Sequence, residues 1–152
     1  MGLFDGYKRQ SYALNDELDP RHATVIILLK SVYADEWETR AELLVLRQIM
    51  SKSPIFSDSD DASDQMIIKR CQSFLASNPN ALRLACEALP DDMRNAVFSM
   101  VIEIVFADGV VDPKEVDFAE EVQKALNISP EFARACVDVF GAMYGAEMER
   151  AA

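Results

Sequence analysis

The chain has 152 residues, enough for one domain with an ordinary buried core. Its 15 basic and 26 acidic residues give a net charge of −11, which argues against nucleic acid as a partner because such binding depends on neutralising phosphate charge. The N-terminus lacks the apolar core of a signal peptide and no apolar run approaches the roughly 20 residues that span a bilayer, so we expect a cytoplasmic protein with no membrane insertion.

Helix-start signals recur along the first half of the chain, whereas the alternating apolar pattern of strands is missing. We expect residues 1–19 to form an extension ahead of a single domain over residues 20–150. Four helices are predicted in the first half of this domain: from Pro20 to about Ala34, from a capping box of Thr39 and Glu42 to about Lys52, from the end of the acidic linker 57–64 to about Ser77, and from Asn80 to just before Pro90.

The second half contains equally clear signals for the fifth and sixth helices. The fifth is predicted to run from Pro90 to about Asp108 and to end at Gly109, which suits a left-handed C-cap. The sixth is predicted to begin at Asp112-Pro113, with Glu115 completing a capping box.

A seventh helix is predicted to begin at Ser129-Pro130, with one apolar stripe made of Phe132, Cys136, Val139, Phe140 and Met143. The domain is therefore predicted to be all-α, with about seven helices. The three cysteines are widely separated and stand among apolar residues at helical spacing, so we expect buried thiols rather than ligands or a disulfide.

Two parts of the chain resemble each other. Residues 32–35 (VYAD) align with residues 105–108 (VFAD), and the same alignment pairs Thr39 with Asp112 and Glu42 with Glu115. Because a helix end, a cap and a capping Glu all agree, the pattern indicates an internal duplication, with two helical hairpins packed about a pseudo-twofold axis.

The first helix of each hairpin is apolar nearly all round and is expected at the centre of the domain. The alignment pairs Lys30 with Glu103, which carry opposite charges on these apolar helices. Either the two side chains approach each other or backbone groups near the axis, or each reaches solvent on its own side.

Acidic residues at the helix ends are candidate ligands for a cation. An Asp at the C-terminal end of a helix is electrostatically unfavourable, because the free carbonyl groups there already carry partial negative charge. This occurs in both copies, and carboxylate and carbonyl oxygens are the ligands that Ca²⁺ and Mg²⁺ prefer. The candidate metal ligands are Asp35, Glu42, Asp108, Asp112 and Glu115. The alternative is that these residues only cap helices and bind backbone N–H groups.

Residues 106–129, FADGVVDPKEVDFAEEVQKALNIS, carry an Ala-Asp-Gly segment followed by an apolar residue, a Glu and an amphipathic helix. This segment resembles the TerB-like domains, named for tellurite-resistance operons and also found in membrane-anchored J-domain co-chaperones. Residues 33–50, YADEWETRAELLVLRQIM, resemble a degenerate first copy, in which Glu36 replaces the family's glycine. The resemblance implies a duplicated seven-helix plan over about residues 20–146.

The resemblance also implies a divalent metal held by Asp108 and Glu115, with Asp35 and Glu42 as the weaker first-half pair, within a stress-response system. We expect no enzymatic activity, because the single histidine, His22, falls in the first turn of a helix and no nucleophile has a recognisable activating partner. Two functions therefore remain open: a cation-binding domain, or a metal-free scaffold for an unknown protein partner. The sequence leaves the oligomeric state open.

Overall fold

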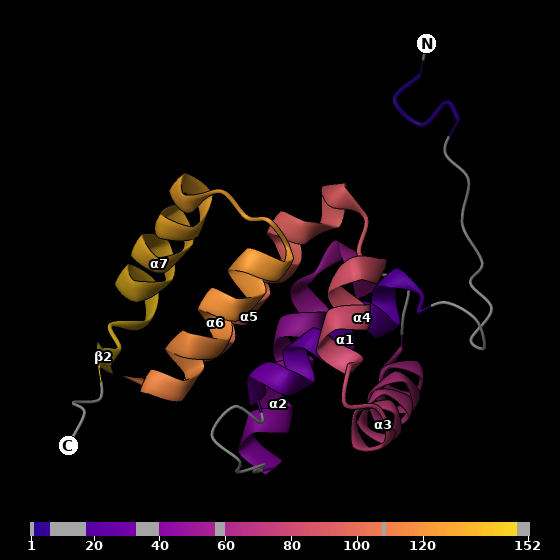
Figure 1. Cartoon of the computed structure of the whole chain (residues 1–152), viewed down its shortest axis with the longest axis horizontal. Coiled ribbons are helices and arrows are strands. Elements are labelled where there is room, and N and C mark those ends of the chain that lie inside the picture. The colour runs from indigo at the N-terminus through magenta and orange to yellow at the C-terminus, as the bar shows by residue number, and fades with distance from the viewer. Residues whose placement is uncertain (1, 7–17, 33–39, 57–59, 108, 149–152) are drawn as a thin grey trace.

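The computed structural model describes residues 2–6, 18–32, 40–56, 60–107 and 109–148. Within these ranges the chain is all-α, as predicted, with seven α-helices and one short 3₁₀ helix (Figure 1). The α-helices are α1 (Pro20–Val32), α2 (Arg40–Lys52), α3 (Asp61–Ser77), α4 (Ala81–Ala88), α5 (Asp91–Ala107), α6 (Pro113–Ala125) and α7 (Pro130–Tyr144), and the 3₁₀ helix η1 is Pro54–Phe56.

Helix starts follow the predicted caps. The backbone N–H of Phe132 donates to the Ser129 hydroxyl at the start of α7, at 3.1 Å. Asp60 caps α3 by accepting from the backbone N–H of Ser63 at 2.7 Å. Residues 61–64, which were predicted to belong to the acidic linker, therefore form the first turn of α3, because one Asp of the linker supplies the cap four residues before the linker's predicted end.

α1 lies at the centre of the domain and packs against α2, α3, α4, α5 and α6. Of its apolar residues, Val25, Ile26, Ile27, Leu28 and Leu29 are fully buried. α5 is the second central helix, packs against α2, α6 and α7 as well as α1, and buries Val97, Phe98 and Val101. The expectation that these two apolar helices occupy the core is thus confirmed. No helix among the described residues is long and apolar enough to cross a bilayer.

α7 is a peripheral helix that packs mainly on α5 (Figure 1). Cys136 is buried, but Val139 and Met143 are 55% and 66% exposed. Only part of the predicted apolar stripe is therefore buried, because a helix that packs mainly on one neighbour buries a narrower face than the apolar pattern spans.

Two strands of two residues each depart from the strand-free prediction. They are β1 (Val110–Val111) and β2 (Glu147–Met148), which pair in parallel with Val110 opposite Glu147. Gly145, in the left-handed conformation at φ +58°, ends α7 and lets the chain turn toward β1. The strand pair joins the end of the domain to the segment that follows α5.

The proposed duplication stays a prediction. Its second hairpin, α5 and α6, is fully formed, whereas residues 33–39 of the first copy and Asp108 of the second lie outside the described residues.

Candidate functional site

The turn between α5 and α6, which we call the α5–α6 corner (residues 106–115), contains three of the five predicted metal ligands: Asp108, Asp112 and Glu115. α5 ends at Ala107, and Gly109 follows at φ +85°. The backbone N–H of Gly109 donates to the Phe106 carbonyl at 3.1 Å, which closes the last turn of the helix. The left-handed C-cap predicted at Gly109 is confirmed.

The start of α6 forms the predicted capping box. Oδ1 of Asp112 accepts from the backbone N–H of Lys114 at 2.7 Å. In return, Oε1 of Glu115 accepts from the backbone N–H of Asp112 at 3.3 Å. The two carboxylates therefore stand side by side at the N-terminal end of α6, where the helix dipole favours negative charge.

The five predicted ligands have different outcomes. Asp112 and Glu115 are brought together at the corner. Asp35 and Asp108 lie outside the described residues, and Glu42 belongs to α2 with its side chain outside them. Among the side chains that the structure describes, no three His, Cys, Asp or Glu residues form a group that could hold a metal ion.

A further acidic residue reaches the corner through the strand pair. The backbone N–H of Glu147 donates to the carbonyl of Gly109 at 3.0 Å, and Glu147 is exposed. The sequence analysis missed Glu147 because this contact joins distant parts of the chain and involves backbone groups, for which no local pattern exists.

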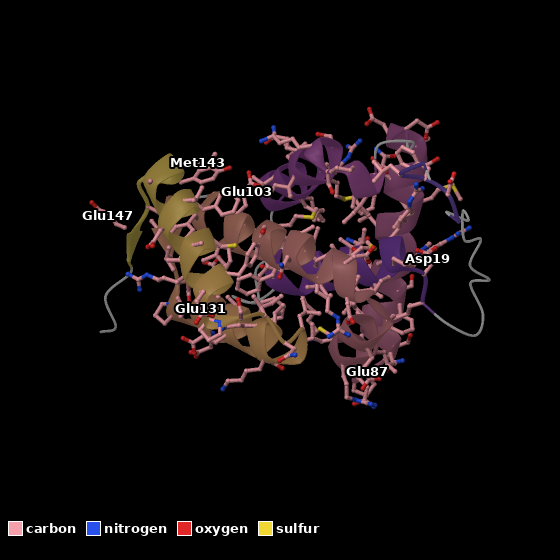
Figure 2. All side chains as sticks on the ribbon, turned by 90° about the horizontal axis from the view of Figure 1, so that it is seen from above. Asp19, Glu87, Glu103, Glu131, Met143 and Glu147 are labelled. Atoms are coloured by element: carbon pink, nitrogen blue, oxygen red, sulfur yellow. The ribbon has the colours of Figure 1, made fainter. Side chains whose placement is uncertain are left out.

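Glu103, near the end of α5, has partners other than Lys30. Tyr144 Oη donates to Glu103 Oε1 at 2.7 Å, and Lys52 Nζ lies 3.9 Å from the same oxygen. Lys30 is exposed, and within the described residues it forms no ion pair with Glu103. Of the two alternatives for Lys30 and Glu103, a direct contact between the side chains is therefore wrong, and Lys30 reaches solvent. The Glu103 carboxylate, labelled in Figure 2, ties α5 to α7 and α2.

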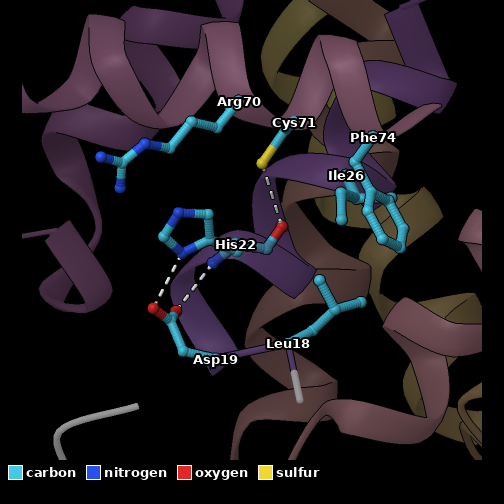
Figure 3. Close-up of a pocket in the computed structure, with 7 residues that line it drawn as sticks. All are labelled: Leu18, Asp19, His22, Ile26, Arg70, Cys71 and Phe74. Carbon is cyan, nitrogen blue, oxygen red and sulfur yellow. Dashed lines mark hydrogen bonds and ion pairs between the residues drawn. The ribbon is translucent and has the colours of Figure 1, made fainter. Parts of the chain in front are cut away.

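A second polar cluster lies at the start of α1. Asp19 caps this helix by accepting from the backbone N–H of His22 at 2.9 Å, and its second oxygen lies 2.8 Å from His22 Nδ1 (Figure 3). Burial alone would raise the pKa of Asp19, but the hydrogen bonds and charge of His22 outweigh it and hold the pKa below its usual range. His22 is a buried partner of the capping residue rather than a surface residue.

The three cysteines are free and buried, as predicted. Cys71 Sγ donates to the His22 carbonyl at 3.5 Å, and burial raises the pKa of this thiol to about 12. Burial likewise raises the pKa of Cys86 to about 11. Since the reactive form of cysteine is the thiolate, neither thiol is set up as a nucleophile at neutral pH.

Comparison with protein families gives one match over most of the domain. The family model described as tellurite resistance protein TerB matches residues 21–136, from the first turn of α1 into α7. The match includes the α5–α6 corner, the whole of α5 and all of α1 except its first residue, Pro20. Comparisons with curated proteins and with solved structures found no match.

Proposed function

Because the chain belongs to the tellurite resistance protein TerB family, we propose that it is a non-enzymatic binding domain of a tellurite-resistance-type stress-response system that binds a divalent cation at the α5–α6 corner. The observation that carries this proposal is the meeting of two helix ends at the corner. The carbonyl end of α5 and the paired carboxylates of Asp112 and Glu115 are joined by a turn of a few residues that includes Asp108.

The ligand chemistry supports a hard cation. Carboxylate and carbonyl oxygens are the groups that Ca²⁺ and Mg²⁺ prefer, and the chain's net charge of −11 raises the local concentration of cations. The Asp112 side chain accepts from the backbone N–H groups of Lys114 and Glu115, and it forms no ion pair with a described basic side chain. Asp108 follows the negative end of α5 in the sequence, and a cation at the corner would offset this unfavourable arrangement of charge.

A non-enzymatic role is supported by the chemistry of the polar side chains. Nδ1 of His22 is held by Asp19, and the adjacent thiol of Cys71 keeps its proton because burial raises its pKa to about 12. These neighbours lack the nucleophile and the base within reach of each other that covalent catalysis requires.

A second candidate is a metal-free scaffold for a protein partner. The capping box favours this candidate, because Asp112 and Glu115 already bind backbone N–H groups at the start of α6. The exposed apolar residues Val139 and Met143 of α7 also favour it, since they offer contact area to a partner.

Thermal unfolding of chelator-stripped protein separates the two candidates. When a cation that binds only the folded state is present at a concentration 100 times its Kd, it stabilises the folded protein by about 2.7 kcal/mol. Millimolar Ca²⁺ or Mg²⁺ should therefore raise Tm by several degrees. Asp108→Asn should abolish this rise. Asp117→Asn, an exposed residue of α6 outside the corner, is the matched control and should retain it.

The result that contradicts the cation site is a Tm that no divalent ion changes, or a rise that Asp108→Asn leaves intact. The first outcome selects the metal-free scaffold, whereas the second means that the cation binds outside the corner. Glu115→Gln is a poorer first choice, because the change also alters the capping box and so lowers stability without any metal.

A further inference from the structure

A pocket of about 300 Å³ opens between the start of α1 and the middle of α3. The residues that line it are Leu18, Asp19, His22, Ile26, Arg70, Cys71 and Phe74 (Figure 3). Figure 2 shows Asp19 and Glu147 at opposite ends of the molecule, so this pocket is separate from the α5–α6 corner to which Glu147 is bonded. Its volume is at the lower end of the range for small-ligand sites.

His22 contributes an unsatisfied polar atom to this pocket. The residue is only 9% exposed, and its Nε2 is buried without a hydrogen-bond partner among the residues that the structure describes. The Asp19 carboxylate can only accept, so the 2.8 Å contact places a proton on Nδ1 and leaves Nε2 as the atom that needs a partner. Buried polar atoms without partners are uncommon in native structures, and each one suggests a missing ligand or water.

Arg70 supplies a free cation on the same side of the imidazole. Its side chain is exposed and forms no hydrogen bond or ion pair with the described residues. Figure 3 shows the guanidinium on the side of the ring that bears Nε2, away from the Asp19 carboxylate. An arginine that has no carboxylate partner among the described residues is available for an anion from outside.

The opposite side of the pocket is apolar. Leu18, Ile26 and Phe74 stand together on the side away from Arg70 (Figure 3). The Cys71 thiol completes the wall as a neutral group, because it donates to the His22 carbonyl. At about 30 Å³ for each water in the liquid, a volume of 300 Å³ corresponds to a ligand on the order of ten non-hydrogen atoms.

From this arrangement we propose that the pocket binds a small monocarboxylate with an apolar body, whose carboxylate lies between His22 Nε2 and the Arg70 guanidinium and whose apolar part contacts Leu18, Ile26 and Phe74. The ligand carboxylate brings no proton, so Nε2 takes one from the solvent on binding and donates it to the nearer ligand oxygen. The guanidinium donates to the carboxylate, for which its planar fork is well suited. Nε2 thereby gains a partner that the described part of the chain does not provide.

Because His22 is the single histidine of the chain, its ring nitrogens have unique NMR signals. We would titrate ¹⁵N-labelled full-length protein with sodium octanoate at constant pH and ionic strength and follow Nε2 and Nδ1. Octan-1-ol, which has the same apolar body without the charge, and inorganic phosphate, which has the charge without the body, are titrated in parallel. We expect a saturable shift of Nε2 with octanoate and at least tenfold weaker binding of the other two probes.

Arg70→Gln should weaken octanoate binding about tenfold or more. Lys69→Gln removes the same charge from the neighbouring position of α3, outside the pocket, and should change the affinity less than twofold. Both residues are exposed, so both variants are expected to fold. Non-saturating shifts would mean that a water satisfies Nε2 and would overturn the proposal. Equal affinity for phosphate or octanol, or equal effects of the two variants, would do so as well.

Discussion

Tyr144, the last residue of α7, donates a 2.7 Å hydrogen bond to the carboxylate of Glu103 on α5. The acceptor side chain is only 13% exposed, and Lys52 of α2 approaches the same oxygen. This contact holds the end of a peripheral helix against a central one, just before the chain turns at Gly145 to pair β2 with β1. It therefore connects the stability of the core to the position of the α5–α6 corner.

Tyr144→Phe removes this hydrogen bond and leaves the Glu103 carboxylate with Lys52 alone. Hydrogen bonds to charged groups contribute about 1.5–3 kcal/mol, so we expect the free energy of unfolding in urea to fall by about 1–2 kcal/mol, the lower part of that range because Tyr144 is only partly buried. Met143→Ala, at a mostly exposed neighbouring position, is the control and should change it by less than about 0.5 kcal/mol. Equal losses in the two variants would contradict the role of the hydrogen bond.

The same contact predicts a loss of stability at high pH. The hydrogen bond to Glu103, burial and the negative charge of Glu103 raise the pKa of Tyr144 above its usual value of 10.0. A raised folded-state pKa means that the contribution to stability is complete below the unfolded pKa and is lost as pH rises through the folded one. Urea unfolding between pH 8 and 11 should show this decline in the natural chain and less of it in Tyr144→Phe.

Asp19 predicts the opposite pH dependence. Its pKa is held below the usual value of 3.8, so its contribution to stability is complete above that value and is lost as pH falls through the folded-state pKa. Asp19→Asn should therefore flatten the acid side of the stability curve, measured by urea unfolding from pH 2.5 to 6. Asp138→Asn, which alters an exposed ion pair with Arg134, should leave the acid side as it is. If the free energy of unfolding falls equally at acid pH in the natural protein and in Asp19→Asn, this role of Asp19 is ruled out.

The capping box predicts that two substitutions of Asp112 lower the free energy of unfolding by different amounts. Asp112→Ala removes the acceptor for the backbone N–H of Lys114 and should lower the free energy of unfolding by about 1 kcal/mol. Asp112→Asn keeps an oxygen acceptor at the cap and should recover most of this loss. If the two substitutions are equally destabilising, the charge at the corner matters more than the cap.

Substitution by alanine should change the free energy of unfolding in opposite directions at Gly109 and Gly141. At Gly109 nothing lies within 4 Å of a new Cβ, but φ is +85°, so Gly109→Ala is expected to cost about 1–2 kcal/mol from backbone strain alone. Gly141 is inside α7 and a Cβ there would meet Phe106 at an ordinary 3.7 Å, so Gly141→Ala should stabilise the protein by about 0.5–1 kcal/mol. Chemical denaturation of both variants checks the pair, and losses in both would show that the α5–α7 contact tolerates no added methyl group.

Local features of the fold were predictable because their causes are local. A cap is decided by a side chain and backbone N–H groups two or three residues later, so Asp112, Glu115 and Ser129 could be assigned from their neighbours alone. The left-handed glycine after α5 was predictable for the same reason. The burial of α1 followed from an apolar surface on all its sides, which requires a central position in any all-α domain.

The sequence by itself thus determined the helices, their caps, the two central elements and the neighbourhood of Asp112 and Glu115. Only the tertiary structure decided that Glu103 meets Tyr144, that Glu147 reaches Gly109, and that His22 and Arg70 border one pocket. These contacts join residues far apart in the chain, and they depend on the packing angles and distances between helices. Such geometry is set by the whole core at once, so no short pattern of residues encodes it.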